Sequence, residues 1–165
     1  MILNKYISFE KNLIMNSKIL KIIHTILAIG LGLFFINAGY NKLSSNKLKD
    51  VDEKQMIYEV IQEQTYKAPV GYNITMNTFK TSGYLGLVSI FQIIAGLLMI
   101  IPQTRLCGLL LLLPIIFNIF MMHVYFDNRM HENVETGILL AINTLLCIYY
   151  YKDILNIMYK PIVKS

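Results

Sequence analysis

The stretch SGYLGLVSIFQIIAGLLMIIPQTRLCGLLLLLPIIFNIFMMHVYF, residues 82–126, decides the fold of this chain. It contains two apolar runs, at 82–101 and 106–126, and each has the length of about 20 residues that a helix needs to cross the hydrocarbon core of a bilayer. Only residues 102–105, Pro-Gln-Thr-Arg, separate the runs. The pattern therefore predicts an antiparallel hairpin of two transmembrane helices, a structure that satisfies its backbone hydrogen bonds internally.

Two further apolar runs, at 19–40 and 135–151, stand on either side of this hairpin. The last run is short and closes on three consecutive tyrosines, which is typical of the aromatic belt at a membrane interface. The chain is therefore predicted to be all-α, an integral membrane four-helix bundle over residues 19–153.

Polar segments complete the predicted organisation. Residues 1–18 are predicted to be an N-terminal cytoplasmic extension, and residues 154–165 a C-terminal tail. A long loop, residues 43–80, joins the first two spans. Within it, residues 50–64 have a helix-forming composition with a partial apolar stripe, which predicts a short helix on the membrane surface. The sequence Ala-Pro-Val-Gly at 68–71 is expected to break that helix.

The composition agrees with a membrane protein. Hydrophobic residues make up 55% of the chain and charged residues only 15%, with a mean hydropathy of +0.51, whereas soluble domains carry about 25% charged residues. The net charge of +5 comes largely from lysines that flank apolar runs. This placement favours contact with the lipid bilayer over binding to nucleic acid. Positive residues close to the span ends favour cytoplasmic N and C termini.

Polar residues inside the spans are the first candidates for function, because they cost free energy in lipid unless they face the bundle interior. Gln92, Asn118 and Asn143 are expected near the middle of the membrane. There they either hold helices together, the favoured interpretation, or line a small polar cavity. Two helix faces carry such residues: Ser82, Gly86, Ser89, Gln92 and Gly96 on one, and Thr136, Asn143 and Cys147 on the other.

A second candidate cluster is expected where the spans reach the outer surface. Asn37 and Lys42 end the first span, His123 lies near the end of the third, and Glu135 opens the fourth. A histidine in this position is able to exchange a proton near neutral pH. The alternative is an interfacial histidine that only hydrogen-bonds a neighbour such as Asn37.

Other chemistries find little support in the sequence. His123, Asp127 and His131 are spaced by four, but the helix is expected to end between them, so no metal site is predicted. His24 is expected to be interfacial. Cys107 and Cys147 are expected to be inert packing residues instead of a redox pair. No phosphate-binding loop, dinucleotide fingerprint or nucleophile elbow occurs.

Three segments together resemble the DoxX-like family of bacterial membrane proteins. They are GLFFINAGYNK at 32–42, FQIIAGLL at 91–98 and PIIFNIFMMH at 114–123, which resemble the family's first three helices in order and spacing. The resemblance implies a four-helix inner-membrane protein. It also implies a link to quinone-dependent sulfur oxidation or to membrane oxidoreductase assemblies. Gln92 stands where many members have a carboxylate, which argues against a proton-carrying role at that position.

The first functional interpretation is a membrane component of a redox system that handles quinone. No cofactor of its own is evident, so electrons would come from a membrane or redox protein partner, with this chain as an accessory subunit. A second interpretation is a non-enzymatic scaffold that binds another membrane protein through the stripe from Ser82 to Gly96. A third is a small-solute permease, which would have to work as a homo-oligomer.

Overall fold

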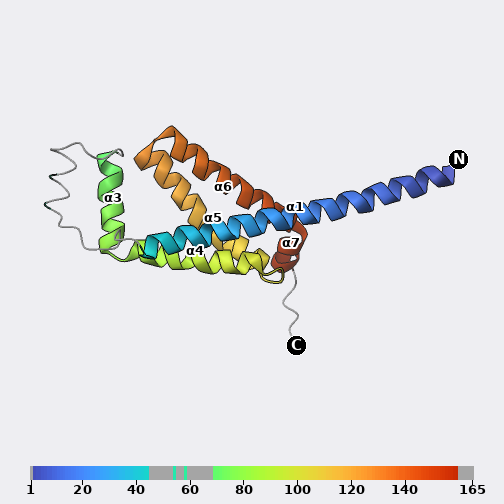
Figure 1. Ribbon diagram of the computed structural model, residues 1–165, viewed down its shortest axis with the longest axis horizontal. Helices are drawn as coiled ribbons and strands as arrows, with labels where there is room; N and C mark the ends of the chain where they lie inside the picture. Colours follow the sequence, from blue (N-terminus) through green and yellow to red (C-terminus); the bar gives the residue numbers. More distant parts are fainter. Residues whose placement is uncertain (1, 45–53, 55–57, 59–68, 160–165) are drawn as a thin grey trace, which may run out of the picture.

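The computed structural model describes residues 2–44, 54, 58 and 69–159, and within them the chain is helical with no strand (Figure 1). The elements in chain order are α1 Ile2–Ser44, α3 Val70–Thr81, α4 Tyr84–Ile100, α5 Arg105–Met122, the π-helical turn η2 His123–Asp127, α6 Met130–Tyr149 and α7 Tyr151–Tyr159. The all-α prediction is confirmed for these residues. Most of the predicted surface helix at 50–64 lies outside the described residues.

Two of these helical segments, Lys18–Ser44 and Arg105–Asp127, are each long and apolar enough to cross a membrane. Two bent pairs pass the same test if each pair is one span. Gly71–Thr81 meets Tyr84–Ile100 at 80°, and Met130–Tyr149 meets Tyr151–Tyr159 at 64°. The described residues therefore contain between two and four candidate spans, which agrees with a membrane protein.

The helix ends differ from the sequence-based expectation at three places. α1 begins at Ile2, so the expected extension continues the first span as one helix. Residues 70–81 were expected to be loop, but they form α3. Pro69 is the N-cap residue of α3, and its φ of −55° lies in the range to which the proline ring restricts the backbone. The fourth helix begins at Met130 instead of 135 and stops before Tyr151, where α7 starts in a new direction.

α1 and α4 lie side by side along most of the length of α4 (Figure 1). Glycines permit this approach: a Cβ atom on Gly96 would lie 2.5 Å from the carbonyl oxygen of Gly32, and one on Gly39 would lie 2.6 Å from that of Ser89. Such close contact of backbones is the usual way in which helices associate in lipid. Of the predicted small-residue stripe, Ser89, Gln92 and Gly96 are buried, whereas a Cβ on Gly86 would meet nothing within 4 Å.

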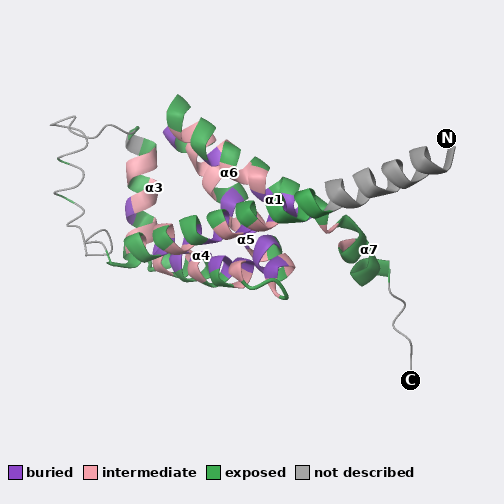
Figure 2. Ribbon diagram, turned by 45° about the vertical axis from the view of Figure 1, so that its right-hand side comes forward, coloured by how far each residue is buried: buried purple, intermediate pink, exposed green. Residues whose placement is uncertain are grey.

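α5 and α6 complete the core. Gly108 brings α5 against the backbone of Ala95 and Met99 on α4. Buried residues gather where α1, α4, α5 and α6 meet, while α7 is largely exposed (Figure 2). The apolar core is formed by Ala28, Leu31, Phe35, Ala95, Met99, Leu109, Leu112, Ile116, Leu146 and Cys147. The predicted inward face of the fourth span is confirmed, since Thr136, Asn143 and Cys147 are buried.

The bundle has two ends with different structures (Figure 1). We call the first the α3 end: it holds α3, the start of α4, the close of α1 and the turn between α5 and α6. We call the second the α7 end: it holds α7 and the short turn between α4 and α5. The candidate site lies at the α3 end.

Candidate functional site at the α3 end

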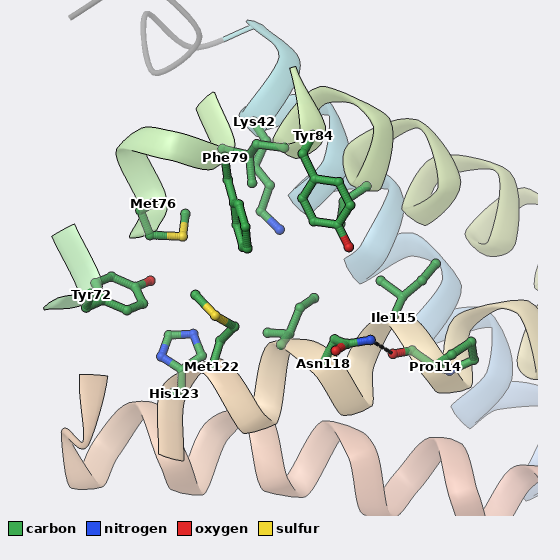
Figure 3. Close-up of a pocket in the computed structure, with 13 residues that line it drawn as sticks. Lys42, Tyr72, Met76, Phe79, Tyr84, Pro114, Ile115, Asn118, Met122 and His123 are labelled. Atoms are coloured by element: carbon green, nitrogen blue, oxygen red, sulfur yellow. Dashed lines mark hydrogen bonds between the residues drawn. The ribbon is translucent and has the colours of Figure 1, made fainter. Parts of the chain in front are cut away.

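A cavity of about 290 Å³ lies between α3 and the facing surface of α4 and α5 (Figure 3). Most of its wall is apolar or aromatic, with a small number of polar groups, which is the composition of a typical small-molecule site. Its lining comprises Lys42 from α1; Tyr72, Met76 and Phe79 from α3; Tyr84, Leu85 and Val88 from α4; and Pro114, Ile115, Asn118, Ile119, Met122 and His123 from α5 and η2.

α3 supplies one wall of this cavity. Tyr72, Met76 and Phe79 are spaced by four and three residues, so one helical face carries all three. The turn that directs α3 across the cavity is at Gly83, whose φ of 77° is in the left-handed region. Glycine adopts this conformation without the steric cost of a Cβ atom.

Lys42 and Asn118 bring polar atoms to the cavity. The ammonium group of Lys42 donates a hydrogen bond to Oε1 of Gln92 at 3.0 Å, which connects the cavity to the buried seam between α1 and α4. The amide nitrogen of Asn118 donates to the carbonyl oxygen of Pro114 at 3.0 Å. This bond turns Oδ1 of Asn118 toward the side of the cavity where His123 lies (Figure 3).

His123 is held by a buried carboxylate. Its Nδ1 lies 2.9 Å from Oδ2 of Asp127, whose side chain is fully covered. Arg129 donates from Nε to Oδ1 of Asp127 at 2.6 Å and from Nη2 to Oδ2 at 2.8 Å. The hydrogen bonds to Asp127 raise the pKa of Arg129, so the guanidinium stays charged. The ring of Tyr72 lies 5.7 Å from that of His123, centroid to centroid.

The backbone explains how Arg129 reaches Asp127. η2 widens the last turn of the helix, and the amide of Asn128 donates to the carbonyl oxygen of His123 at 2.6 Å. Asn128 has a φ of 49°, in the left-handed region that asparagine tolerates better than most residues. The chain therefore reverses at once, and the guanidinium lies against the carboxylate two residues earlier.

The structure brings only part of the predicted outer cluster together. Lys42 and His123 line the cavity, but Asn37 and Glu135 are exposed and do not. The expectation that all four would meet is therefore wrong. Asn37 points away because α1 is rotated so that Gly32 and Gly39 face α4.

The three amides that were expected near the middle of the membrane have separate roles instead of one shared cavity. Asn118 lines the cavity, and Gln92 touches it only through Lys42. Asn143 is fully buried and donates to the carbonyl oxygen of Leu109 at 3.2 Å, which joins α6 to α5 as helix-to-helix packing. The amide of Asn118 bonds the carbonyl of Pro114 itself, not that of Leu110, which is the carbonyl that Pro114 leaves without a helical donor.

Several residues of the site were missed by the sequence analysis. The aromatic and methionine side chains of α3 belong to a segment that was expected to be loop. Their regular spacing after Pro69 was the available signal. The helix was expected to end near Asp127, although the spacing of four between His123 and Asp127 already allowed a contact. His131 does not join them: it is exposed and lies 3.4 Å from Glu132. Among the described residues, no group of three His, Cys, Asp or Glu side chains is arranged to hold a metal.

The α7 end also holds buried polar residues. His24 was expected to be interfacial, yet it is buried, stacks on Tyr149 at 4.2 Å and hydrogen-bonds the carbonyl oxygen of Leu146 at 3.3 Å. Arg105 is also buried and donates to the carbonyl of Met99 and to the hydroxyl of Thr25, each at 3.1 Å. Cys107 is exposed and Cys147 buried, and both are free thiols.

Comparisons of the chain with protein-family models, curated proteins and solved structures gave no match.

Proposed function

We propose that the cavity at the α3 end binds the ring of a membrane quinone or quinol, and that the protein is a membrane component of a redox system. The observation that carries this proposal is the meeting of His123, Asn118 and Lys42 in one cavity with aromatic and methionine walls. A quinone ring is flat and apolar, with oxygen atoms at opposite edges. It needs apolar faces to pack against and hydrogen-bonding groups at its edges.

The wall residues fit such a ring. Tyr72, Phe79 and Tyr84 offer aromatic surface from two helices, and Met76 and Met122 offer polarisable sulfur that packs well against rings (Figure 3). The volume of about 290 Å³ is at the lower end of the range for small-molecule sites, which suits a single ring. An isoprenoid tail would remain in the surrounding lipid.

The same proposal includes the arrangement in the membrane. If each bent pair is one span, the chain crosses the bilayer four times and has the topology of a DoxX-like inner-membrane protein. The proposed cytoplasmic termini place the α7 end inside and the α3 end outside. This is tested with single cysteines in a chain lacking Cys107 and Cys147. An impermeant thiol reagent should label a cysteine at 54 in intact cells and one at 165 only after the membrane is opened; the reverse result refutes the orientation.

This function is favoured over the scaffold interpretation for a structural reason. The scaffold was expected to bind its partner through the small-residue stripe. Ser89, Gln92 and Gly96 of that stripe already pack on α1 of the same chain. A partner would have to displace α1 to reach them.

The first experiment is native mass spectrometry of the protein released gently from its own membrane. A co-released mass of quinone size is expected for the natural chain. It should be lost or reduced at least about 10-fold in His123→Ala, because the ring loses a hydrogen-bonding partner. His131→Ala is the matched control, since His131 is exposed and outside the cavity. Release of a bare protein, or equal retention of the ligand in both variants, would contradict the proposal.

A further inference from the structure

We propose that Asp127, clamped by Arg129, fixes His123 as a hydrogen-bond acceptor, so that the cavity selects a ring bearing hydroxyl groups over the corresponding carbonyl form. The selected class is a hydroquinone or a related phenol. This inference rests on the proposed function and deepens it, because it states which redox form of the ring the site holds.

The first step is the position of the imidazole proton. An ionised carboxylate only accepts hydrogen bonds, so a contact of 2.9 Å between Oδ2 of Asp127 and Nδ1 of His123 requires the proton on Nδ1. In the neutral ring, Nε2 then carries a lone pair. Nε2 has no hydrogen-bond partner among the described residues, and His123 lines the cavity. In this neutral form the histidine offers an acceptor to a ligand.

The second step is the role of Arg129. Its two hydrogen bonds engage both oxygens of Asp127, which fixes the rotation of the carboxylate and favours its ionised form. Asp127 is thus a positioning residue that acts through His123. The other charged or titratable groups around this arrangement are Tyr72 on α3, Lys42 on α1 and Glu132 on α6, the last at 3.4 Å from Arg129.

The third step is a second fixed acceptor. The amide nitrogen of Asn118 donates to the carbonyl of Pro114, and this bond orients the amide so that Oδ1 is its acceptor toward the His123 side of the cavity (Figure 3). Asn118 and His123 both belong to the α5–η2 wall, and both present acceptors (Figure 3). The donor Lys42 stands on another wall. A hydroxyl group of the ligand donates to an acceptor on the α5–η2 wall and accepts from Lys42, so it satisfies the groups on both walls.

A carbonyl oxygen can accept a hydrogen bond from Lys42, but it has no proton to donate and leaves both acceptors of the α5–η2 wall without a donor. Sites built to receive a hydroxyl group discriminate strongly against analogues that lack it. We expect the natural chain to bind a short-chain hydroquinone about 10-fold to 100-fold more tightly than the same compound as a quinone.

The test combines tautomer and binding measurements on the whole protein in detergent. Nitrogen NMR of ¹⁵N-histidine-labelled protein reports which ring nitrogen carries the proton. The signal of His123 is identified among those of the three histidines because it disappears in His123→Phe. Without ligand, the Nδ1–H form is expected for His123. In Asp127→Asn, the amide oxygen should stay on Arg129 and the amide nitrogen should face Nδ1. That forces the Nε2–H form and turns the acceptor into a donor.

Binding of the hydroquinone and the quinone is then measured under anaerobic conditions. Asp127→Asn should reduce the preference for the hydroquinone by at least about 10-fold or reverse it. Glu135→Gln makes the same chemical change at an exposed residue outside the cavity and should leave the preference unchanged. Asn118→Leu is the second variant: it removes one acceptor at an exposed helix position and should weaken hydroquinone binding selectively, even if Asp127→Asn does not fold.

The outcomes separate the two proposals. If neither form of the ring binds the natural chain, the proposed function fails. If both forms bind equally, or if His123 has its proton on Nε2 in the natural chain, the selection by Asp127 is overturned while the quinone site stands. An unchanged preference in Asn118→Leu also counts against the inference.

Discussion

The two ends of the bundle contain the same residue types, a histidine and an arginine, in opposite structural roles. At the α7 end, His24 is buried against the ring of Tyr149 and hydrogen-bonds a main-chain carbonyl. Arg105 there also donates to a main-chain carbonyl. Together with the contact of Arg105 to the hydroxyl of Thr25, these bonds join neighbouring helices to one another.

At the α3 end, the histidine and the arginine meet at one buried carboxylate instead. Asp127 receives both His123 and Arg129, and the remaining nitrogen of the imidazole lies at a cavity. The presence of a histidine in an apolar helix therefore does not by itself indicate whether its role is structural or functional. What decides its role is whether its partners come from the backbone of neighbouring helices or from a side chain that leaves one ring nitrogen open.

The largest effect is expected from a change that separates α1 from α4, because the packing of these two helices supports both ends of the bundle. In Gly96→Leu, the new Cβ would lie 2.5 Å from the carbonyl oxygen of Gly32, so α1 and α4 must separate. We expect a loss of about 3 kcal/mol or more in stability. Thermal unfolding in detergent measures it. Gly86→Leu is the control, because a Cβ there meets nothing within 4 Å. Equal stability of the two variants would show that the helices do not approach as described.

A smaller effect, confined to stability, is expected from Arg105→Met at the α7 end. The variant leaves the carbonyl of Met99 and the hydroxyl of Thr25 without this buried donor, which should cost about 2 kcal/mol. The stability of Arg105→Lys should lie between those of the natural chain and Arg105→Met, since an ammonium keeps the charge but lacks the planar fork of the guanidinium. Thermal unfolding measures the loss, and ligand affinity should not change. A change in affinity would mean that the two ends are coupled.

Replacing each histidine by phenylalanine tests the comparison directly. His24→Phe keeps a ring for stacking on Tyr149 but loses the bond to Leu146, so stability should fall by about 1.5 kcal/mol with ligand binding intact. His123→Phe should abolish selective binding of the hydroquinone. Unfolding and binding are measured on both variants. A loss of binding in His24→Phe would break the distinction between a structural and a functional histidine.

The existence of the main helices was predictable from the sequence, because the length and low charge of an apolar run are local properties. Their ends were less predictable. α3 was missed since its polar composition resembles a loop, although it starts directly after Pro69, a residue whose fixed φ is compatible with the start of a helix. The number of spans depends on how the bent pairs lie in a membrane.

The candidate site was predictable only in part, for reasons of helix rotation. The height of Asn37 and Lys42 along α1 follows from sequence, but the direction in which each points depends on which face packs. Lys42 comes three residues after Gly39, near the face that meets α4, whereas Asn37 comes two residues before it, on the opposite side. Asp127 was missed because its partner Arg129 approaches only through the left-handed turn at Asn128.

The smallest effect is expected at the bend that sets α3 across the cavity. Gly83→Ala places a Cβ on a residue with a φ of 77° and should cost about 1 kcal/mol in stability. If α3 supplies a wall only at this angle, hydroquinone affinity should also fall by a few-fold, as measured by titration in detergent. Gly83→Asn should recover much of both losses, because asparagine tolerates the left-handed region. A loss of stability without a loss of affinity would place the ligand away from Tyr72, Met76 and Phe79. The polar wall of α5 and η2 would then be sufficient for binding, and α3 would only cover it.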